Sequence, residues 1–195
     1  MLSYGFKISD NMNMKIEPYF QQLYDVPVIA DSSYSVLNRR DFYVENALVN
    51  RGKGRNIGVD ITLERYLNKG LYYMVTASIF DSKYYGGDRK WRNTLYNRNF
   101  IVNVLGGKEW MVGRDRQNMF SVNFKITLQG GDRYAPVDEV ATLLDPDREV
   151  QYDETKAFSK QFSPMFITNF SVGYKINRKK VSHEFSIKSL NTTGC

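Results

Sequence analysis

The sequence has almost none of the residues that most often build catalytic, disulfide or metal sites. Its 195 residues include one cysteine, Cys195, and one histidine, His183. A single cysteine excludes an internal disulfide and a cysteine metal cluster. No partner is placed beside His183 to make it a general base or a metal ligand. We therefore expect no enzymatic activity, no catalytic or metal-binding residues and no cofactor, and we interpret His183 as structural or interfacial.

The sequence also lacks any apolar run near the roughly 20 residues that a transmembrane helix needs. Its first residues, Met1–Lys7, show no charged segment followed by an apolar stretch, so we expect no signal peptide. The mean hydropathy is −0.47. A low value does not separate soluble proteins from membrane β-barrels, because each lipid-facing residue of a barrel strand alternates with a polar one. Residue periodicity therefore has to distinguish the two classes.

Positive charge is in excess but not concentrated. The net charge is +6 and the isoelectric point is about 9.3. The one tight basic run is 178–180, and such a run is usually a solvated turn. We expect no nucleic-acid partner.

The most informative stretch is Asn118–Gln129, which reads N-M-F-S-V-N-F-K-I-T-L-Q. In an extended chain successive side chains point to opposite faces. Every second residue from Phe120 to Leu128 is apolar, and every second residue from Ser121 to Gln129 is polar. A soluble strand usually keeps such a pattern for five or six residues. About ten residues is the length of a strand that crosses an outer membrane.

The same alternation recurs along the chain and predicts eight strands. The expected strands are 2–8, 12–21, 57–64, 71–79, 100–110, 118–129, 166–175 and 181–188. Pro18 lacks a backbone donor, so we expect a break or bulge there. The fold class is therefore all-β, an antiparallel up-and-down transmembrane β-barrel segment.

The connections alternate between short turns and long loops. Long connections are expected at 25–55, 84–94 and 130–164, and short turns lie between the other strands. Successive connections of antiparallel strands lie at opposite ends of a sheet, so all long loops should gather at one end. Short turns at one end and long loops at the other are typical of outer-membrane barrels. A soluble β-sandwich would instead have strands of five or six residues and no segregation of loops by length.

Several segments together carry a family resemblance. They include E-P-Y-F-Q-Q-L-Y-D-V-P-V at 17–28 and G-G-D-R-Y-A-P-V-D at 130–138. The remaining segments are 58–64, 78–84, 91–94, 105–109 and 174–185. In their order and spacing they resemble the C-terminal part of the β-barrel of TonB-dependent outer-membrane receptors, in the family with a carboxypeptidase-regulatory-like N-terminal domain.

The resemblance implies a fold and a role. Residues 1–195 would form a partial outer-membrane barrel domain, about eight strands of a 22-stranded barrel, without the plug domain and the final strand. The family takes up scarce nutrients, such as an iron chelate, a glycan or a peptide, across the outer membrane of Gram-negative cells. The implied partners are outer-membrane lipid, a plug domain, an inner-membrane energy-coupling complex and a surface lipoprotein. Cys195 would then mark a truncated end.

Two sets of residues are candidates for function. The first set lies on the polar faces of the strands and would face the lumen and the plug: Asn13, Lys15, Glu17, Asp60, Glu64, Asn123 and Lys125. The second set contains aromatic residues of the long loops that could stack on a ligand: Tyr84, Tyr85, Trp91, Tyr134 and Tyr152. The acidic connection 145–154 lacks calcium-loop spacing and is interpreted as solvated. Gly106 and Gly107 are expected to accommodate twist or the close approach of a plug.

Two other functions stay open from the sequence. Eight strands can close into a small barrel whose interior is filled by side chains, with a structural or adhesion role in the outer membrane. A soluble β-sandwich that binds a carbohydrate or a protein is the remaining alternative.

Overall fold

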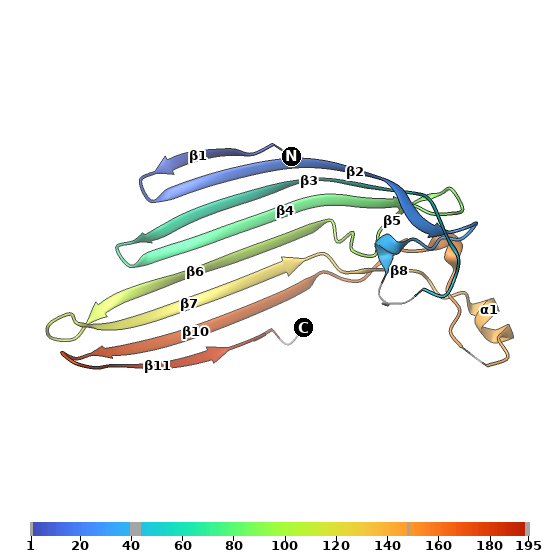
Figure 1. Ribbon diagram of the computed structural model, residues 1–195. Coiled ribbons are helices and arrows are strands. Elements are labelled where there is room, and N and C mark those ends of the chain that lie inside the picture. Colours follow the sequence, from blue (N-terminus) through green and yellow to red (C-terminus); the bar gives the residue numbers. More distant parts are fainter. Residues whose placement is uncertain (1, 40–43, 148, 194–195) are drawn as a thin grey trace.

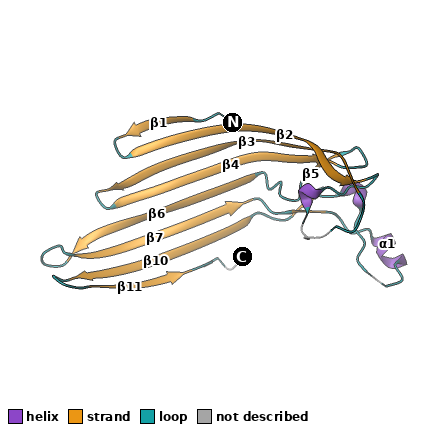
Figure 2. Cartoon of the chain, viewed as in Figure 1, coloured by secondary structure: helices purple, strands orange, loops and turns teal. Residues whose placement is uncertain are grey.

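The computed structural model describes residues 2–39, 44–147 and 149–193, so Cys195 lies outside the described residues. Strands dominate the described chain (Figure 2). They are β1 (Tyr4–Ser9), β2 (Met12–Ile29), β3 (Leu48–Asn68), β4 (Leu71–Tyr85), β5 (Trp91–Asn93), β6 (Phe100–Val112), β7 (Asn118–Gln129), β8 (Arg133–Tyr134), β9 (Lys160–Gln161), β10 (Met165–Asn177) and β11 (Ser182–Ser189). The helix α1 (Glu139–Leu144) and the 3-10 turns Val36–Asn38 and Glu154–Lys156 lie in connections. Among the described residues, no helix is long and apolar enough to cross a membrane.

The long strands form one antiparallel up-and-down sheet in the order β1-β2-β3-β4-β6-β7-β10-β11, with β5 added beside β4 (Figure 1). Each long strand pairs with the next long strand along the chain. All four short turns lie at one end of the sheet, and the three long connections lie at the other end (Figure 1). The predicted all-β class, the eight strands and the segregation of loops by length are confirmed.

Three strands are markedly longer than the sequence pattern predicts: β4 continues to Tyr85 instead of ending at residue 79, and β2 and β3 also extend. β2 continues to Ile29 and β3 begins at Leu48, so much of the expected loop 25–55 is paired sheet. The glycines that suggested a loop have a packing role. A Cβ on Gly52 would lie 2.4 Å from Val28 Cγ1, and one on Gly54 would lie 2.8 Å from Leu37 Cδ1. Glycine is needed there because other side chains lie over the strand.

The expected break at Pro18 is wrong. Pro18 pairs in register with Val59, and its carbonyl oxygen accepts a hydrogen bond from Leu2 N at 3.1 Å. In an antiparallel sheet the N and O atoms of one residue point to the same neighbour. The missing donor of Pro18 therefore points toward the side of β1, just beyond the first residue of that strand, and the ladder with β3 stays intact.

The irregularity of β2 lies further along the strand. The register shifts between Leu23 and Val26, where β2 has one extra residue, and shifts back between Val26 and Pro27, where Arg51 is extra on β3; Asp25 has a φ of 53°. An extra residue in one strand of a pair is a β-bulge, which bends the strand. This bulge separates the regular part of β2 from the part that enters the long loops.

The two faces of the sheet differ in chemistry. Paired residues of antiparallel strands lie on the same face, so the register assigns every side chain. One face, called here the apolar face, carries rows such as Ile16, Ile61, Ala77, Val102 and Leu128. The opposite polar face carries rows such as Lys15, Thr62, Thr76, Asn103 and Thr127. The alternation predicted in the sequence is thus continuous across strands.

Burial is concentrated at the loop end. Within the described parts of the eight long strands, the buried side chains are Val26, Val28 and Tyr84. All three lie at the ends of strands that enter the long connections. The remaining buried side chains lie in or beside those connections: Ser35, Arg92, Leu95, Thr94, Asn97 and Ala157. The sheet itself has no covered face.

The topology can be compared with the two alternative folds, a closed eight-stranded barrel and a soluble β-sandwich. β1 and β11 lie at opposite edges (Figure 1), and no ladder joins them within the described ranges. A sandwich needs two packed sheets of short strands. The only other sheet among the described residues is the two-stranded pair β8-β9, and β3 alone runs for 21 residues.

Candidate functional site: the loop cap and the polar face

The three long connections fold together into what we call the loop cap, made of the described residues within 30–47, 86–99 and 130–164 (Figure 1). Local capping shapes each piece. The side chain of Asp138 accepts from Ala141 N at the start of α1, and that of Asp153 accepts from Thr155 N at the start of a 3-10 turn. Asp and Ser are favoured at such N-terminal positions because their oxygens satisfy free backbone donors.

Hydrogen bonds tie the three connections to one another. Leu95 N donates to Asn38 Oδ1 at 2.8 Å, which joins the first connection to the second. Ser32 Oγ donates to Glu154 Oε2 at 3.2 Å, which joins the first to the third. Arg133 N donates to Leu95 O at 3.2 Å, which joins the third to the second. The cap is therefore one packed unit.

An ion pair lies at the base of the cap. Arg92 Nη1 and Nη2 donate to Asp88 Oδ1 and Oδ2 at 2.8 and 2.5 Å, and the Arg92 side chain is only 6% exposed. The guanidinium lowers the pKa of the Asp88 carboxyl below its ordinary value, and the same hydrogen bonds raise the pKa of Arg92. Bidentate pairs of this kind fix geometry as well as charge.

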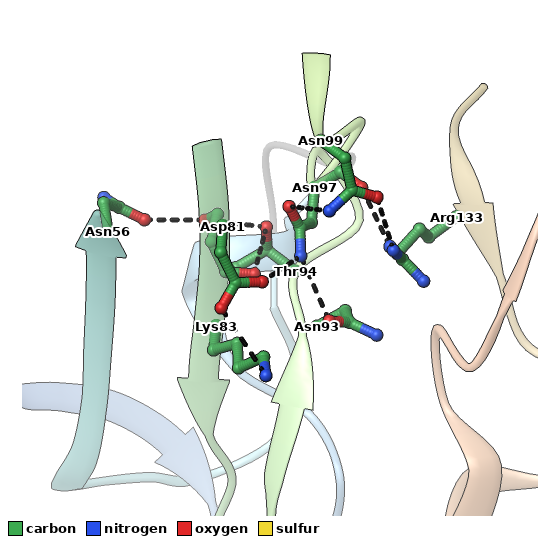
Figure 3. Close-up of polar contacts among 9 residues, drawn as sticks. Asn56, Asp81, Lys83, Asn93, Thr94, Asn97, Asn99 and Arg133 are labelled. Carbon is green, nitrogen blue, oxygen red and sulfur yellow. Dashed lines mark hydrogen bonds and ion pairs between the residues drawn. The ribbon is translucent and has the colours of Figure 1, made fainter. Parts of the chain in front are cut away.

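A second polar network joins the cap to the end of β4 (Figure 3). Asn97, which is fully buried, donates through Nδ2 to Asp81 Oδ1 at 2.9 Å and to Asn93 Oδ1 at 3.0 Å. Arg133 donates through Nε to Asn97 O at 2.8 Å and through Nη2 to Asn99 Oδ1 at 2.7 Å. Desolvation lowers the pKa of Arg133. These bonds hold the connection 94–99 against the sheet.

The cap forms an open cavity of about 760 Å³. Aromatic and polar side chains line it together: Tyr34, Asn38, Leu95, Arg133, Tyr134, Tyr152, Glu154, Phe158 and Phe162 are among its lining residues. Tyr134 and Phe162 stack with ring centroids 4.3 Å apart. The buried Tyr34 Oη and Asn38 Nδ2 have no hydrogen-bond partner among the described residues. A cavity of this size, lined by aromatic rings and a few polar groups, is typical of small-molecule sites.

The loop aromatics predicted from the sequence fall into three places. Tyr134 and Tyr152 line the cavity. Tyr84 is fully buried and packs edge-on against Phe158, 6.1 Å between centroids, so it supports the cavity wall. Tyr85 and Trp91 contact each other at 5.5 Å on the apolar face of the sheet. The structure therefore brings two of the five together in the cavity.

Sequence reasoning missed several lining residues. Tyr34, Phe158 and Phe162 lie in irregular connections, where no period marks a side chain as inward-facing. The stacking partner of Tyr134 is Phe162, which is 28 positions away in the numbering and is brought close by the β8–β9 pair next to it. Aromatic residues are four of the 29 residues in 134–162, no more than the 14% of the whole chain, so composition did not point to this cluster either.

All seven residues predicted to face a lumen lie on the polar face by register. On β2 and β3, Asn13 is opposite Glu64, and Glu17 is opposite Asp60. Lys15 Nζ lies 2.8 Å from Glu17 Oε1, and Ser78 Oγ donates to Asp60 Oδ1 at 2.6 Å. Lys125, on β7, is exposed. The polar face is a partly hydrogen-bonded surface without a covering layer in the described chain.

The role expected for Gly107 has to be revised. A Cβ on Gly107 would lie 2.2 Å from Asn123 Oδ1 and 2.7 Å from the Tyr72 ring. Gly107 lies between Tyr72 and Asn123 in the register, and Tyr72 Oη donates across it to Asn123 Oδ1 at 2.7 Å. The space left by the glycine is thus filled by a side chain of the sheet itself. Tyr19 covers Gly58 in the same way, since a Cβ there would lie 2.6 Å from Tyr19 Oη.

The other predicted features have structural surroundings. His183 lies opposite Ile176 on the apolar face near a turn. In the acidic connection, Asp145 Oδ1 accepts from Asp147 N at 2.9 Å, and Asp153 is held by Thr155 and Lys156, which lower its pKa to about 2. No group of three or more His, Cys, Asp and Glu side chains within the described ranges is arranged to hold a metal ion.

Comparisons with known proteins add no assignment: no protein-family model, no curated protein and no solved structure that was compared matches the chain.

Proposed function

We propose that the chain is part of the β-barrel of a TonB-dependent outer-membrane receptor, which takes up an iron chelate, a glycan or a peptide by energy-coupled transport. The observation that carries this proposal is the distribution of burial. The long strands have an uncovered apolar face and an uncovered polar face, and their buried side chains are confined to the loop end; the buried residues in the middle of the sheet are the glycines Gly106 and Gly107. A sheet of this kind suits two different surroundings, lipid on one side and a polar interior on the other.

The dimensions of the apolar face support a membrane location. On β3 the apolar residues lie between Arg55 and Arg65. The ten residue steps from Arg55 to Arg65, the two cations that bound this row, span about 33 Å along the strand, which at a tilt of about 40° gives about 25 Å across a membrane, the height of the apolar band of outer-membrane barrels. Aromatic pairs lie at both ends of this face: Tyr85 with Trp91, and Trp110 with Phe120 at 5.7 Å.

Within this proposal each region has a role. The polar face, with Asp60, Asn123 and the other residues of that set, faces the lumen and a plug domain. The cavity of the loop cap captures the ligand, with Tyr134, Phe162 and Tyr152 supplying aromatic surfaces and Arg133, Asn38 and Glu154 supplying polar groups. Release would follow plug rearrangement driven by an inner-membrane complex. The chain itself catalyses no reaction in this scheme.

The test is to express the chain and compare its circular dichroism and gel mobility with and without detergent micelles. We expect a β signal that requires detergent, because the apolar face has no cover of its own. Heat-modifiable mobility in detergent would mean that the eight strands close by themselves, which favours the small structural barrel. A monomer that melts cooperatively in plain buffer would contradict the proposal and favour a soluble binding protein.

A further inference from the structure

At the loop end of the apolar face, just beyond the apolar rows, three cations lie side by side on neighbouring strands. Lys53 and Arg55 lie on β3, and Lys83 lies on β4 directly opposite Arg55. Tyr85 is opposite both Lys53 and Trp91. The register places these five side chains on one face, and we call them the headgroup patch.

Ring contacts organise the patch. The Arg55 guanidinium carbon lies 5.6 Å from the centroid of the Trp91 ring, and Lys53 Nζ lies 6.0 Å from that of Tyr85. The two rings contact each other at 5.5 Å. Cations held over aromatic faces keep their charge while their stems cover apolar surface. The Nε atom of Arg55 is buried and has no hydrogen-bond partner among the described residues.

The patch keeps a positive excess. Asp81 is the acidic neighbour on this face, with its Oδ2 3.5 Å from Lys83 Nζ, and its Oδ1 accepts from Asn97 (Figure 3). Nearby Arg51 is neutralised by Asp31 at 3.2 Å. Three cations against one carboxylate leave a net charge of about +2 for an anion to bind.

We propose that the headgroup patch binds the phosphate groups of an anionic lipid whose acyl chains lie against the apolar face. This inference rests on the membrane location proposed above. The position of the patch selects a lipid as the anion: Ile57 and Ile79 lie on the same face, next to Arg55 and Asp81 along their strands. A ligand with phosphates beside an apolar tail meets both surfaces at once, whereas free phosphate meets only the cations.

The test measures lipid binding to the 195-residue chain in detergent micelles by native mass spectrometry. The probes are bisphosphorylated lipid A, the same lipid without phosphates, and inorganic phosphate as competitor. The variant is K53Q/R55Q/K83Q. Its matched control is K7Q/K175Q/K188Q, which removes three lysines from the polar face of β1, β10 and β11. Both variants are checked for the β signal of the parent chain.

We expect the patch variant to bind the bisphosphorylated lipid about 100-fold more weakly, about fivefold for each cation removed near a lipid surface. The control should bind within about twofold of the parent. The parent should bind the phosphate-free lipid as weakly as the patch variant binds the phosphorylated one, and inorganic phosphate should not compete at equal concentration.

Three results would overturn the inference: equal binding by the patch variant and the parent, an equal loss in the control, or efficient competition by inorganic phosphate. If the patch variant does not fold, the two lipids compared on the parent chain decide the question without it. Failure of the membrane proposal is separate, because it would show as a chain that folds in plain buffer. A chain that requires detergent but does not distinguish the two lipids contradicts only the lipid site.

Discussion

The middle of the sheet and the loop cap are stabilised in different ways. In the middle of the sheet, backbone ladders join every strand to its neighbours, yet the side chains of both faces stay uncovered. In the cap, few residues are in strands, but Asn97 and Ser35 are almost completely buried, and ion pairs such as Arg92–Asp88 are shielded. One chain thus contains a sheet with no covered face and a cap with buried side chains of its own.

Under the membrane location proposed above, the surroundings of each region select the kind of stabilisation. Where lipid would supply the apolar medium, hydrogen-bonded strands with an alternating pattern suffice. Where water surrounds the chain, irregular connections need their own buried cluster and satisfied polar groups. The two regions should therefore respond differently to mutation and to pH.

The largest effect is expected from charge on the apolar face. Ile61 lies between Ile16 and Ala77 in the middle of that face. Ile61→Arg should lower the free energy of unfolding by about 2–4 kcal/mol, the usual penalty for arginine at the middle of a lipid-facing strand. The measurement is a denaturant titration of the chain inserted in lipid vesicles.

The matched control for this substitution is Thr62→Arg. Thr62 is the next residue and lies on the polar face, opposite Lys15 and Thr76. Its replacement should cost below about 1 kcal/mol, mostly from the like charge of Lys15. Equal penalties at the two positions would mean that the two faces do not meet different surroundings.

A smaller effect is expected inside the polar face. In Gly107→Ala, the added methyl group meets Asn123 and the Tyr72 ring, so the bond between those side chains should break. Overpacking of this kind costs about 1–3 kcal/mol. Gly5→Ala is the control, since a Cβ there meets only Met14 O at 3.9 Å. Vesicle titrations should separate the two variants, and a neutral Gly107→Ala would show that Tyr72 has another low-energy position.

The smallest effect is a partial loss of the cap in acid. The folded pKa of Asp88 is lowered by Arg92, and that of Asp153 is lowered to about 2. A lowered folded pKa gives stability that is present above the unfolded value, about 3.9, and is lost as the pH falls through the folded value. The aromatic near-ultraviolet signal should therefore decline below about pH 4, while the far-ultraviolet β signal in detergent persists.

Asp88→Asn sharpens this comparison. The variant lacks the carboxylate that pairs with Arg92, so its cap should be weaker at neutral pH and its acid transition should depend on Asp153 alone. Loss of both signals at one pH, in the parent and in the variant, would mean that the cap and the sheet unfold as one unit.

The sequence predicts the middle of the sheet better than its ends. In β7 the alternation from Phe120 to Leu128 identifies the strand and both its faces, because a period of two residues places apolar side chains on one face and polar side chains on the other. In β3 the run Arg51–Arg55 reads as a loop, since glycines and cations obscure the period. The cause is tertiary: Val28 and Leu37 lie over Gly52 and Gly54 and leave no room for side chains there.

The cavity is predictable only in part for a related reason. Tyr134 and Tyr152 stand out as aromatics in a long connection, and both line it. The burial of Tyr84 depends on the third connection meeting the end of β4, and the stacking of Phe162 on Tyr134 depends on the two ends of that connection meeting in the β8–β9 pair. No local pattern encodes such a meeting. The residues of the polar face, in contrast, can be predicted from the alternation of side chains along each strand. All seven of its candidates therefore lie on one side of the sheet.

The bulge at Asp25 inserts one residue into β2, and every side chain that follows it therefore moves to the opposite face of the strand. Before it, even-numbered residues such as Ile16 and Phe20 lie on the apolar face, opposite Ile61 and Ile57. After it, the even-numbered Val26 and Val28 are buried at the loop end of the sheet. Even-numbered residues of β2 thus lie on one face before the bulge and on the other face after it. Deleting a single residue at the bulge would therefore exchange the surroundings of every side chain beyond it while changing no side chain's identity.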